Sequence, residues 1–241
     1  MVSKDYLADG APVAALRDLS FSIEPGEFVA FVGPSGCGKT TLLKIVGGLI
    51  VPDAGSVSVA SLSPEEARQK GLFSFVFQNP VLLPWRTIVS NLRLPGEVLG
   101  RETRDPKELL ARVGLGGFEQ RYPHELSGGM AQRAALARAL TFDPSVLLLD
   151  EPFGALDEFT RDDLNSLLAK ICVEIGVTAI LVTHSLSEAV FLANRVFVLS
   201  KRPGTVTTTF DVPFPRSREA SIRSEPVFFD TVERLRRCLV A

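Results

Sequence analysis

The chain has 241 residues, of which 46% are hydrophobic and 22% are charged, a composition typical of a folded globular protein. Its 26 basic residues nearly balance its 28 acidic residues, and this argues against a nucleic-acid partner, which is usually bound through a basic surplus. Three distant cysteines and two histidines argue against a disulfide framework or a structural zinc site. The sequence has no signal peptide and no apolar run near the roughly 20 residues of a transmembrane helix, so the expected compartment is the cytoplasm.

Short apolar segments alternate with longer helical segments, which predicts an α/β fold with a largely parallel sheet. The expected strands are Ser20–Ile23, Phe28–Val32, Ser56–Ala60, Leu72–Phe77, Val146–Leu149, Thr178–Thr183, Arg195–Ser200 and Thr205–Val212. The expected helices are Lys39–Gly47, Pro64–Lys70, Ile88–Leu94, Pro106–Val113, Gly129–Thr141, Glu158–Ile175, Leu186–Leu192 and a last helix that begins at Pro226. Residues 80–142 lack a convincing strand. We therefore expect them to form a helical subdomain, inserted into a catalytic core of residues 1–79 and 143–241.

A glycine-rich segment between an expected strand and an expected helix matches the phosphate-loop pattern G-x-x-x-x-G-K-[ST]. Glycines let backbone amides converge on phosphate oxygens, and the helix N-terminus adds positive potential. We expect Lys39 to reach the β- and γ-phosphates and the Thr40 hydroxyl to ligate Mg²⁺. The expected ATP-binding residues of this loop are Gly33, Pro34, Ser35, Gly36, Cys37, Gly38, Lys39, Thr40 and Thr41.

Two carboxylates follow the apolar strand that begins at Val146. The carboxyl ends of parallel strands meet at the edge of the sheet where α/β folds bind their ligands. Beside a phosphate loop, Asp150 is expected to hold Mg²⁺ and Glu151 to polarise the attacking water. A phosphate loop with an acidic pair still leaves kinases, GTPases and motor proteins open.

The segment Leu126-Ser127-Gly128-Gly129-Met130 precedes a clean helical stretch, and Ser127 is expected to cap that helix. It resembles the LSGGQ signature motif of ATP-binding cassette (ABC) ATPases, with Met in the last place. Glycine amides, a cap hydroxyl and a helix N-terminus make this segment a second candidate phosphate site. In that family the signature of one subunit closes over the phosphate loop of the other. The resemblance therefore implies a head-to-tail homodimer with ATP and Mg²⁺ between the subunits.

Other segments resemble further family motifs, in the family's order along the chain. The resemblance implies that Gln78 contacts Mg²⁺ and the water, that Asp157 belongs to the D-loop, and that His184 contacts the γ-phosphate. Tyr6 resembles the aromatic residue that stacks on adenine. The implied catalytic set is Lys39, Gln78, Glu151 and His184, and the implied metal ligands are Thr40, Gln78 and Asp150.

The implied fold is that of a P-loop NTPase: a RecA-like core with a parallel sheet, an antiparallel β subdomain and a helical subdomain. Family members usually have a strand before the position of Val2. The resemblance therefore leaves two expectations open, that the start is truncated or that the antiparallel subdomain lacks an edge strand.

The runs FQNPVLLPWRTIVSNL and EPFGALD are similar to those of nitrate, sulfonate and taurine importer ATPases. This implies an ATPase that drives uptake of a small oxyanion such as nitrate, a sulfonate, taurine or bicarbonate. Its partners would be integral membrane permease subunits and, indirectly, a solute-binding protein. Its place would be the cytoplasmic face of the cell membrane, as a peripheral subunit.

Two other functions remain alternatives to this importer: thiamine-precursor import and soluble iron–sulfur assembly. The signature and the lack of a guanine-specifying NKxD pattern oppose a kinase or GTPase. The short interval between Thr40 and Ser127 opposes a DNA-repair or structural-maintenance ATPase, which would carry a long insertion there.

Three features allow two interpretations each. Trp85, the only tryptophan, either lines a groove for the membrane subunit or packs in the helical core. Cys37 is either a tolerated variable position or a thiol whose alkylation blocks ATP binding. The C-terminal arginines form either a solvated helix face or a basic surface towards lipid or a partner; they are Arg216, Arg218, Arg223, Arg234, Arg236 and Arg237.

Overall fold

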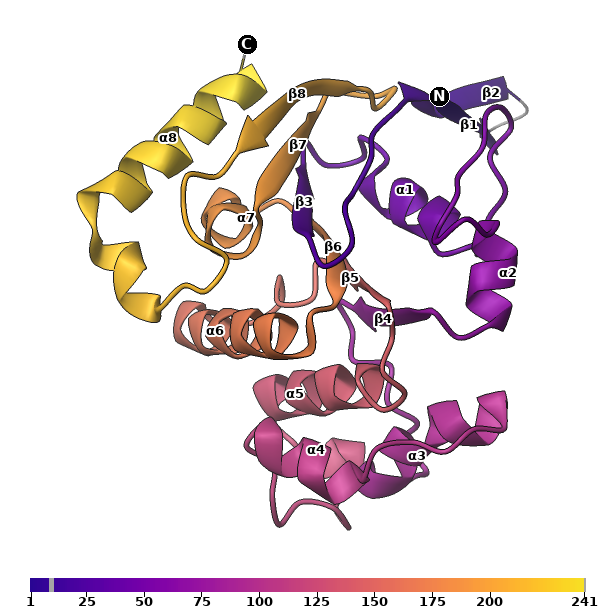
Figure 1. Cartoon of the computed structure of the whole chain (residues 1–241), viewed down its shortest axis with the longest axis vertical. Coiled ribbons are helices and arrows are strands. Elements are labelled where there is room, and N and C mark those ends of the chain that lie inside the picture. The colour runs from indigo at the N-terminus through magenta and orange to yellow at the C-terminus, as the bar shows by residue number, and fades with distance from the viewer. Residues whose placement is uncertain (9–10, 241) are drawn as a thin grey trace.

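A six-stranded sheet lies at the centre of the molecule (Figure 1), whose computed structural model describes residues 1–8 and 11–240. The spatial order is β4-β5-β6-β3-β7-β8, and β8 alone runs antiparallel to its neighbour. The predicted α/β fold with a largely parallel sheet is thus confirmed. The strands are β3 (Phe28–Val32), β4 (Phe73–Phe77), β5 (Val146–Asp150), β6 (Thr178–Thr183), β7 (Arg195–Leu199) and β8 (Val206–Asp211).

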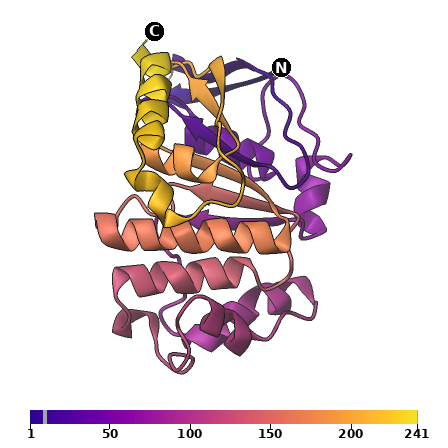
Figure 2. The ribbon, with the colours of Figure 1, turned by 60° about the vertical axis from the view of Figure 1, so that its left-hand side comes forward.

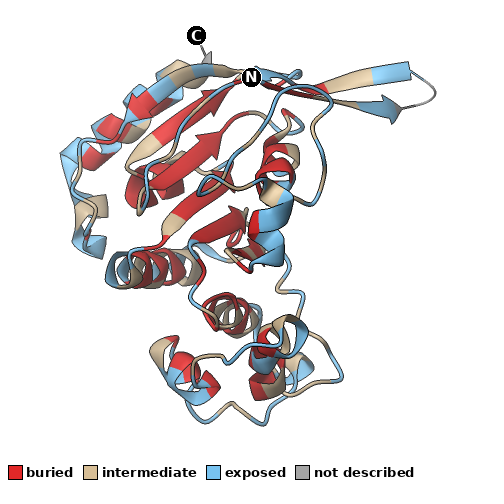
Figure 3. Ribbon diagram, turned by 45° about the vertical axis from the view of Figure 1, so that its right-hand side comes forward, coloured by how far each residue is buried: buried red, intermediate tan, exposed pale blue. Residues whose placement is uncertain are grey.

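Helices cover both faces of this sheet, which explains why its central strands are buried along nearly their whole length (Figure 3). In β3, Phe28, Ala30 and Val32 join the core formed with helices α6 and α7, whereas Val29 and Phe31 join the core formed with α1. Full burial of such a side chain contributes about 1.5–3 kcal/mol. The helices of the catalytic part are α1 (Lys39–Val46), α2 (Pro64–Gln69), α6 (Glu158–Ile175), α7 (Leu186–Leu192) and α8 (Pro226–Val240), with a 3-10 turn η2 (Ala220–Ser224) before α8.

An antiparallel hairpin of β1 (Val2–Ala8) and β2 (Ala11–Leu19) stands apart from the main sheet. The segment after Met1 is therefore itself a strand, and β2 was not predicted. The strands predicted at Ser20–Ile23 and Ser56–Ala60 are absent from the described residues. Both segments line a cavity of about 720 Å³, and neither has a ladder partner there, although their apolar side chains still pack on the core.

Between β4 and β5 the described chain is helical and contains no strand, as predicted, although the exact subdomain boundaries stay a prediction. The first helix was predicted to stop before Pro95, yet it continues to Leu99 and ends at Gly100, whose φ is +62°. Its buried residues extend past the proline to Gly96, so packing overrides the local signal. The elements are α3 (Ile88–Leu99), α4 (Pro106–Arg112), a 3-10 turn η1 (Pro123–Glu125) and α5 (Gly128–Ala139).

Three of the C-terminal arginines anchor the tail to the core, so they belong neither to a solvated helix face nor to a basic surface towards lipid or a partner. Arg218, 9% exposed, donates to three main-chain carbonyls at the end of α7, and burial lowers its pKa to about 10. Arg216 bonds carbonyls at the end of α6, and Arg223 pairs with Asp162. The remaining arginines lie exposed on α8, which runs along one edge of the molecule (Figure 2); they are Arg234, Arg236 and Arg237.

Candidate nucleotide-binding site

The phosphate loop connects β3 to α1 and depends on glycine at two places. Gly38 has a φ of +100°, and a Cβ there would lie 2.5 Å from Leu16 Cδ2 and 2.8 Å from Ala15 O. Gly36 also has a positive φ, of +76°, but a Cβ there would meet no atom within 4 Å. Gly38 lets the loop pack against β2. Gly36 keeps an open backbone surface that a phosphate could approach.

Lys39 lies inside this loop and is only 6% exposed. Its Nζ donates to Gly33 O at 2.8 Å and to Pro34 O at 3.1 Å. The ammonium group is therefore already directed at the cradle where a phosphate would sit.

Cys37, within the same loop, is completely buried, and burial raises the pKa of its thiol. An inaccessible, protonated thiol is a poor target for alkylation. This geometry favours a packing role for the side chain, leaving its backbone for the phosphate.

Hard oxygen donors meet where β5 ends. Thr40 Oγ1 lies 3.0 Å from Asp150 Oδ1, and burial raises the pKa of the Asp150 carboxyl, which a nearby cation would offset. No cluster of three or more His, Cys, Asp or Glu in the described part of the chain is arranged to hold a metal. Mg²⁺ does not need such a cluster, because it binds through one or two side chains plus phosphate and water. The Thr40–Asp150 pair fits that requirement.

The other polar groups come from the ends of three strands that are neighbours in the sheet. Gln78 follows β4, Glu151 follows β5 and His184 follows β6. His184 Nδ1 lies 3.1 Å from Glu151 Oε2. A Cβ on Gly154 would lie 3.4 Å from Gln78 Nε2 and 3.6 Å from His184 Cε1. The three side chains therefore converge around Gly154, whose role the sequence alone did not indicate.

Glu151 has a φ of +45°, which is uncommon for a residue with a side chain. Its amide donates to Val182 O at 2.9 Å, so the turn is fixed against β6. Strained backbone of this kind often accompanies a functional side chain that must point in one direction.

Tyr6 reaches the same region from β1. Its hydroxyl lies 3.4 Å from Thr41 Oγ1, and the side chain is 40% exposed. The hairpin thus places an accessible aromatic ring beside the start of α1. The structure places Tyr6 next to the phosphate loop, and its stacking on adenine stays a prediction.

The signature segment lies elsewhere, at the start of α5. Ser127 accepts from Met130 N at 3.3 Å as the helix cap, and Asp157 caps the neighbouring α6 by accepting from Thr160 N at 3.0 Å. Gly129 allows these helix starts to touch, because a Cβ there would lie 2.6 Å from Thr160 Cγ2. No hydrogen bond found in residues 1–8 and 11–240 joins the signature to the phosphate loop. Within the described part of the chain, the two helix ends that the sequence predicts to bind phosphate are thus not joined by a hydrogen bond.

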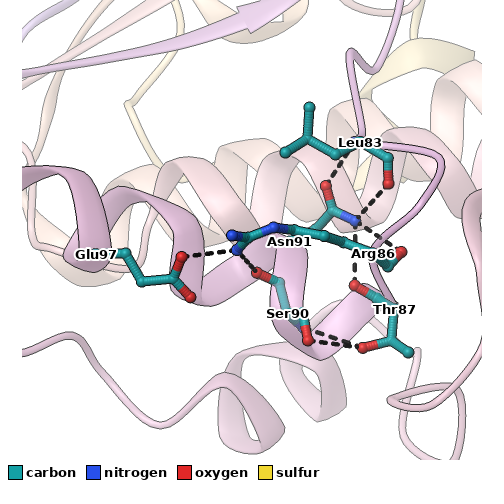
Figure 4. Close-up of polar contacts among 6 residues, drawn as sticks. All are labelled: Leu83, Arg86, Thr87, Ser90, Asn91 and Glu97. Carbon is teal, nitrogen blue, oxygen red and sulfur yellow. Dashed lines mark hydrogen bonds and ion pairs between the residues drawn. The ribbon is translucent and has the colours of Figure 1, made fainter.

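Trp85 is 72% exposed, so the interpretation that it packs in the helical core is wrong. The buried Asn91 holds the loop around it through the N–H and C=O of Leu83 and the C=O of Arg86 (Figure 4). The loop therefore exposes the indole ring of Trp85 to solvent.

The sheet order, the phosphate loop and the polar groups at its edge define a P-loop nucleotide-binding protein. The family model described as ABC transporter matches residues 16–154, and the chain belongs to this family. No helix among the described residues is long and apolar enough to cross a membrane.

Curated relatives resemble most of the chain. The aliphatic sulfonates import ATP-binding protein SsuB of Bacillus cereus is 42% identical over 223 residues, covering 91% of this chain and 88% of that protein. The taurine import ATP-binding protein TauB of Yersinia pestis is 43% identical over 224 residues, covering 89% of this chain and 87% of that protein. The nitrate import ATP-binding protein NrtC of Synechococcus elongatus is 42% identical over 232 residues. The match covers 93% of this chain but only 35% of the length of NrtC.

Among solved structures, a dimeric post-hydrolysis state of the ATP-binding cassette MJ0796 bound to ADP and Pi is 32% identical, with a TM-score of 0.77. The match covers 89% of this chain and 97% of that one. It confirms the predicted P-loop NTPase fold with its antiparallel and helical parts.

Proposed function

We propose that the chain is the ATP-hydrolysing subunit of an ABC importer for a small oxyanion, such as nitrate, a sulfonate, taurine or bicarbonate. The names of the sulfonate, taurine and nitrate relatives support this substrate class. The subunit works as a head-to-tail homodimer on integral membrane permease subunits, at the cytoplasmic face of the membrane. A solute-binding protein delivers the solute to the permease, not to this chain.

Nucleotide binding rests on the phosphate loop and on Tyr6. Backbone N–H groups of residues 33–41, except Pro34, and the N-terminus of α1 surround the phosphates, and Lys39 adds a point charge on the β- and γ-phosphates. The Tyr6 ring stacks on adenine. The 40% exposure of its side chain and its proximity to Thr41 support this role.

Thr40, Asp150 and Gln78 are the groups that would hold Mg²⁺. When bound there, Mg²⁺ offsets negative charge on the phosphate oxygens. The hydroxyl of Thr40 is already 3.0 Å from the Asp150 carboxylate, so these two groups need little rearrangement to share a ligand.

Hydrolysis rests on Glu151 and His184. The Glu151 carboxylate accepts a hydrogen bond from the attacking water and holds it in line with the γ-phosphate. His184, bonded to that carboxylate, contacts the γ-phosphate. Most of the rate enhancement then comes from positioning and charge stabilisation.

The signature segment completes the site from the partner subunit. Ser127, Gly128 and Gly129 are directed at the γ-phosphate of the partner's ATP, and Asp157 lies beside them. The observation that supports the proposal is this division: Thr40 contacts Asp150 and Glu151 contacts His184 beside the phosphate loop, whereas among the described residues Ser127 at the start of α5 forms no hydrogen bond with that loop.

A Glu151→Gln variant tests the proposal, because it keeps size and hydrogen-bonding capacity but removes the basic carboxylate. ATP should bind without being hydrolysed, and ATP-bound dimer should accumulate by mass action. Size-exclusion chromatography should show an ATP-dependent dimer for this variant and mostly monomer with ADP. Wild-type hydrolysis by the variant would contradict the role of Glu151. An inactive variant that stays monomeric with ATP would mean that the dimer forms only in the assembled transporter.

The alternatives differ in their partners. A thiamine-precursor importer would also copurify with permease subunits, whereas an iron–sulfur assembly ATPase would copurify with soluble scaffold proteins. Purification from membranes, followed by identification of the associated proteins, separates the two classes. The ligand of an associated binding protein would then name the solute.

A further inference from the structure

The chain between β8 and α8, residues 212–225, contacts both α6 and α7 before it enters α8 (Figure 1). We call these residues the tail segment. Both helices that it contacts start at the candidate site: α6 begins directly after Asp157, and α7 begins two residues after His184. Two arginines of the tail segment, Arg218 and Arg223, make the contacts.

Arg218 binds the end of α7 that lies away from His184. Its Nη1 donates to Val190 O and to Phe191 O at 2.8 Å each, and its Nη2 donates to Ala193 O at 2.9 Å. The last carbonyls of a helix lack partners within the helix, and a positive charge beside them is favourable. The guanidinium therefore supplies partners for two carbonyls of the last turn and for the one that follows the helix.

This end of α7 depends on the tail segment for its position. The helix has only seven residues, a length at which helices need tertiary contacts to persist. Arg218 is 9% exposed, and it also donates to Pro215 O at 2.7 Å and to Phe214 O at 3.2 Å within its own segment. Its planar group thus joins the tail segment to α7 through several bonds at once, which the ammonium group of a lysine cannot do.

Arg223 joins α7 to α6. Its Nη1 forms an ion pair with Asp162 on α6, and its guanidinium carbon lies 3.8 Å from the centroid of the Phe191 ring on α7. Phe191 is completely buried, and a cation over an aromatic face is attracted more strongly where water is excluded. One side chain of the tail segment therefore contacts both helices.

His184 lies between a fixed strand and this held helix. On one side β6 is paired with both β3 and β5. On the other side Ser185 begins α7, and its Oγ accepts from Glu188 N at 3.3 Å. The His184 side chain is 56% exposed, so its distance of 3.1 Å from Glu151 depends largely on where the start of α7 lies.

We propose that Arg218 and Arg223 are positioning residues for His184. The tail segment holds α7 against α6 and the sheet, and α7 in turn holds the imidazole against Glu151. When these contacts are lost, α7 shifts and the imidazole leaves the place where it would meet the γ-phosphate. This inference rests on the proposed role of His184 in hydrolysis.

The test compares two arginines of the tail segment. Arg218→Met removes the bonds to the end of α7. Arg216→Met is the matched control, because it removes bonds to Cys172 O and Val177 O at the far end of α6 and none to α7. Both changes remove a partly buried cation that binds main-chain carbonyls, so both are expected to lower the Tm. Each purified full-length variant is assayed for kcat and for the KM for ATP.

A second measurement follows the imidazole without catalysis. The sequence contains two histidines, His124 and His184, so the imidazole Cε1–H groups give two signals in a ¹H–¹³C spectrum. A His124→Gln variant assigns them. The spectrum is recorded without nucleotide, so the His184 signal reports the surroundings of the ring, while the His124 signal is an internal control.

Arg218→Met should lower kcat by about 10- to 100-fold, the scale of a misplaced site group, and leave the KM for ATP near wild type. It should shift the His184 signal but not the His124 signal. Arg216→Met should leave kcat and both signals near wild type. If Arg218→Met does not fold, Arg218→Lys retains the cation without the planar group, and the same changes are expected in smaller measure.

Equal changes of kcat and of the His184 signal in the Arg218 and Arg216 variants would overturn the inference, because a general loss of stability would then explain both. An unchanged His184 signal in Arg218→Met and Arg218→Lys would also overturn it. Failure of the proposed function looks different. If His184→Ala hydrolyses ATP at the wild-type rate, or if the His184 signal shifts in Arg218→Met without any change in kcat, the positioning stands and the assigned role of His184 is wrong.

Discussion

The two candidate phosphate-binding regions of this chain differ in how much of a site each contains. At the carboxyl ends of β3, β5 and β6, polar groups already contact one another: Thr40 with Asp150, and Glu151 with His184. At the start of α5, the one side-chain hydrogen bond of Ser127 within the described part of the chain is to the amide of Met130 in its own helix, and Asp157 likewise caps its own helix. One region is assembled within the chain, and the other presents a helix end outwards.

This difference shows how a composite site can be divided. In the proposed function, the groups around the water and the metal lie at the ends of neighbouring strands of one sheet. The groups that would stabilise the partner's phosphate lie at the start of a separate helix, α5. Such a division would make the completed site depend on association and would couple closure to catalysis.

The largest expected effect is loss of ATP hydrolysis when either region is mutated, followed by its recovery when the two variants are mixed. Lys39→Ala removes the cation of the assembled region, and Ser127→Arg fills the helix end of the other. Each should lower ATP hydrolysis by about 10²-fold or more, the scale of a lost electrostatic contact. In a head-to-tail heterodimer of the two variants, one site combines the intact phosphate loop with the intact signature. A mixture should therefore regain about a quarter of wild-type activity.

The matched control mixes Lys39→Ala with Glu151→Gln, both in the assembled region. Every dimer of that pair lacks an intact site, because each chain has lost its own assembled region. No recovery is expected there. Recovery by this control mixture, or none with Ser127→Arg, would contradict the division of the site between two chains.

A smaller effect concerns a buried carboxyl behind the assembled region. Glu188 lies on α7, is 4% exposed, and its Oε1 has no hydrogen-bond partner among the described atoms. Burial raises the pKa of this carboxyl. The nearby charges of Arg161, His184 and Arg223 lower the pKa, but by less than burial raises it. Between its unfolded and folded pKa values the folded protein holds more protons, so stability falls as pH rises through that window.

Glu188→Gln should therefore raise the Tm at neutral pH, by about 2–4 °C for each kcal/mol gained. The difference from wild type should vanish below the ordinary pKa of about 4.3, where both side chains are neutral. Glu158→Gln on the exposed first turn of α6 is the control and should lower the Tm slightly, because a negative charge favours a helix N-terminus. A lower Tm for Glu188→Gln at neutral pH would mean that ionised Glu188 is stabilised by those arginines.

The sequence allowed prediction of local features and missed those that depend on distant contacts. The phosphate loop, the two acids at the end of β5 and the cap at Ser127 each lie within a few residues, so a short pattern identifies them. Gly154 and Arg223 act by meeting residues far along the chain, and no local pattern reports that.

The same reason explains the errors. Ser20–Ile23 has the alternation of a strand but no neighbour to pair with. Arg218 looks like a surface residue until its carbonyl partners at the end of α7 are known.

The smallest expected effect on the isolated subunit, and the sharpest test of its outer surface, comes from Trp85→Ala. The side chain is 72% exposed, so its removal should change stability by no more than about 0.5 kcal/mol. A buried tryptophan would cost about 3–5 kcal/mol on the same change. If the indole contacts the membrane subunits, the variant should lose transport in vesicles more than it loses basal ATPase activity. The fluorescence of Trp85 in the wild-type subunit should shift when the membrane subunits bind. An unchanged spectrum, with transport and ATPase activity falling together, would place the partner's contact elsewhere on the helical segment.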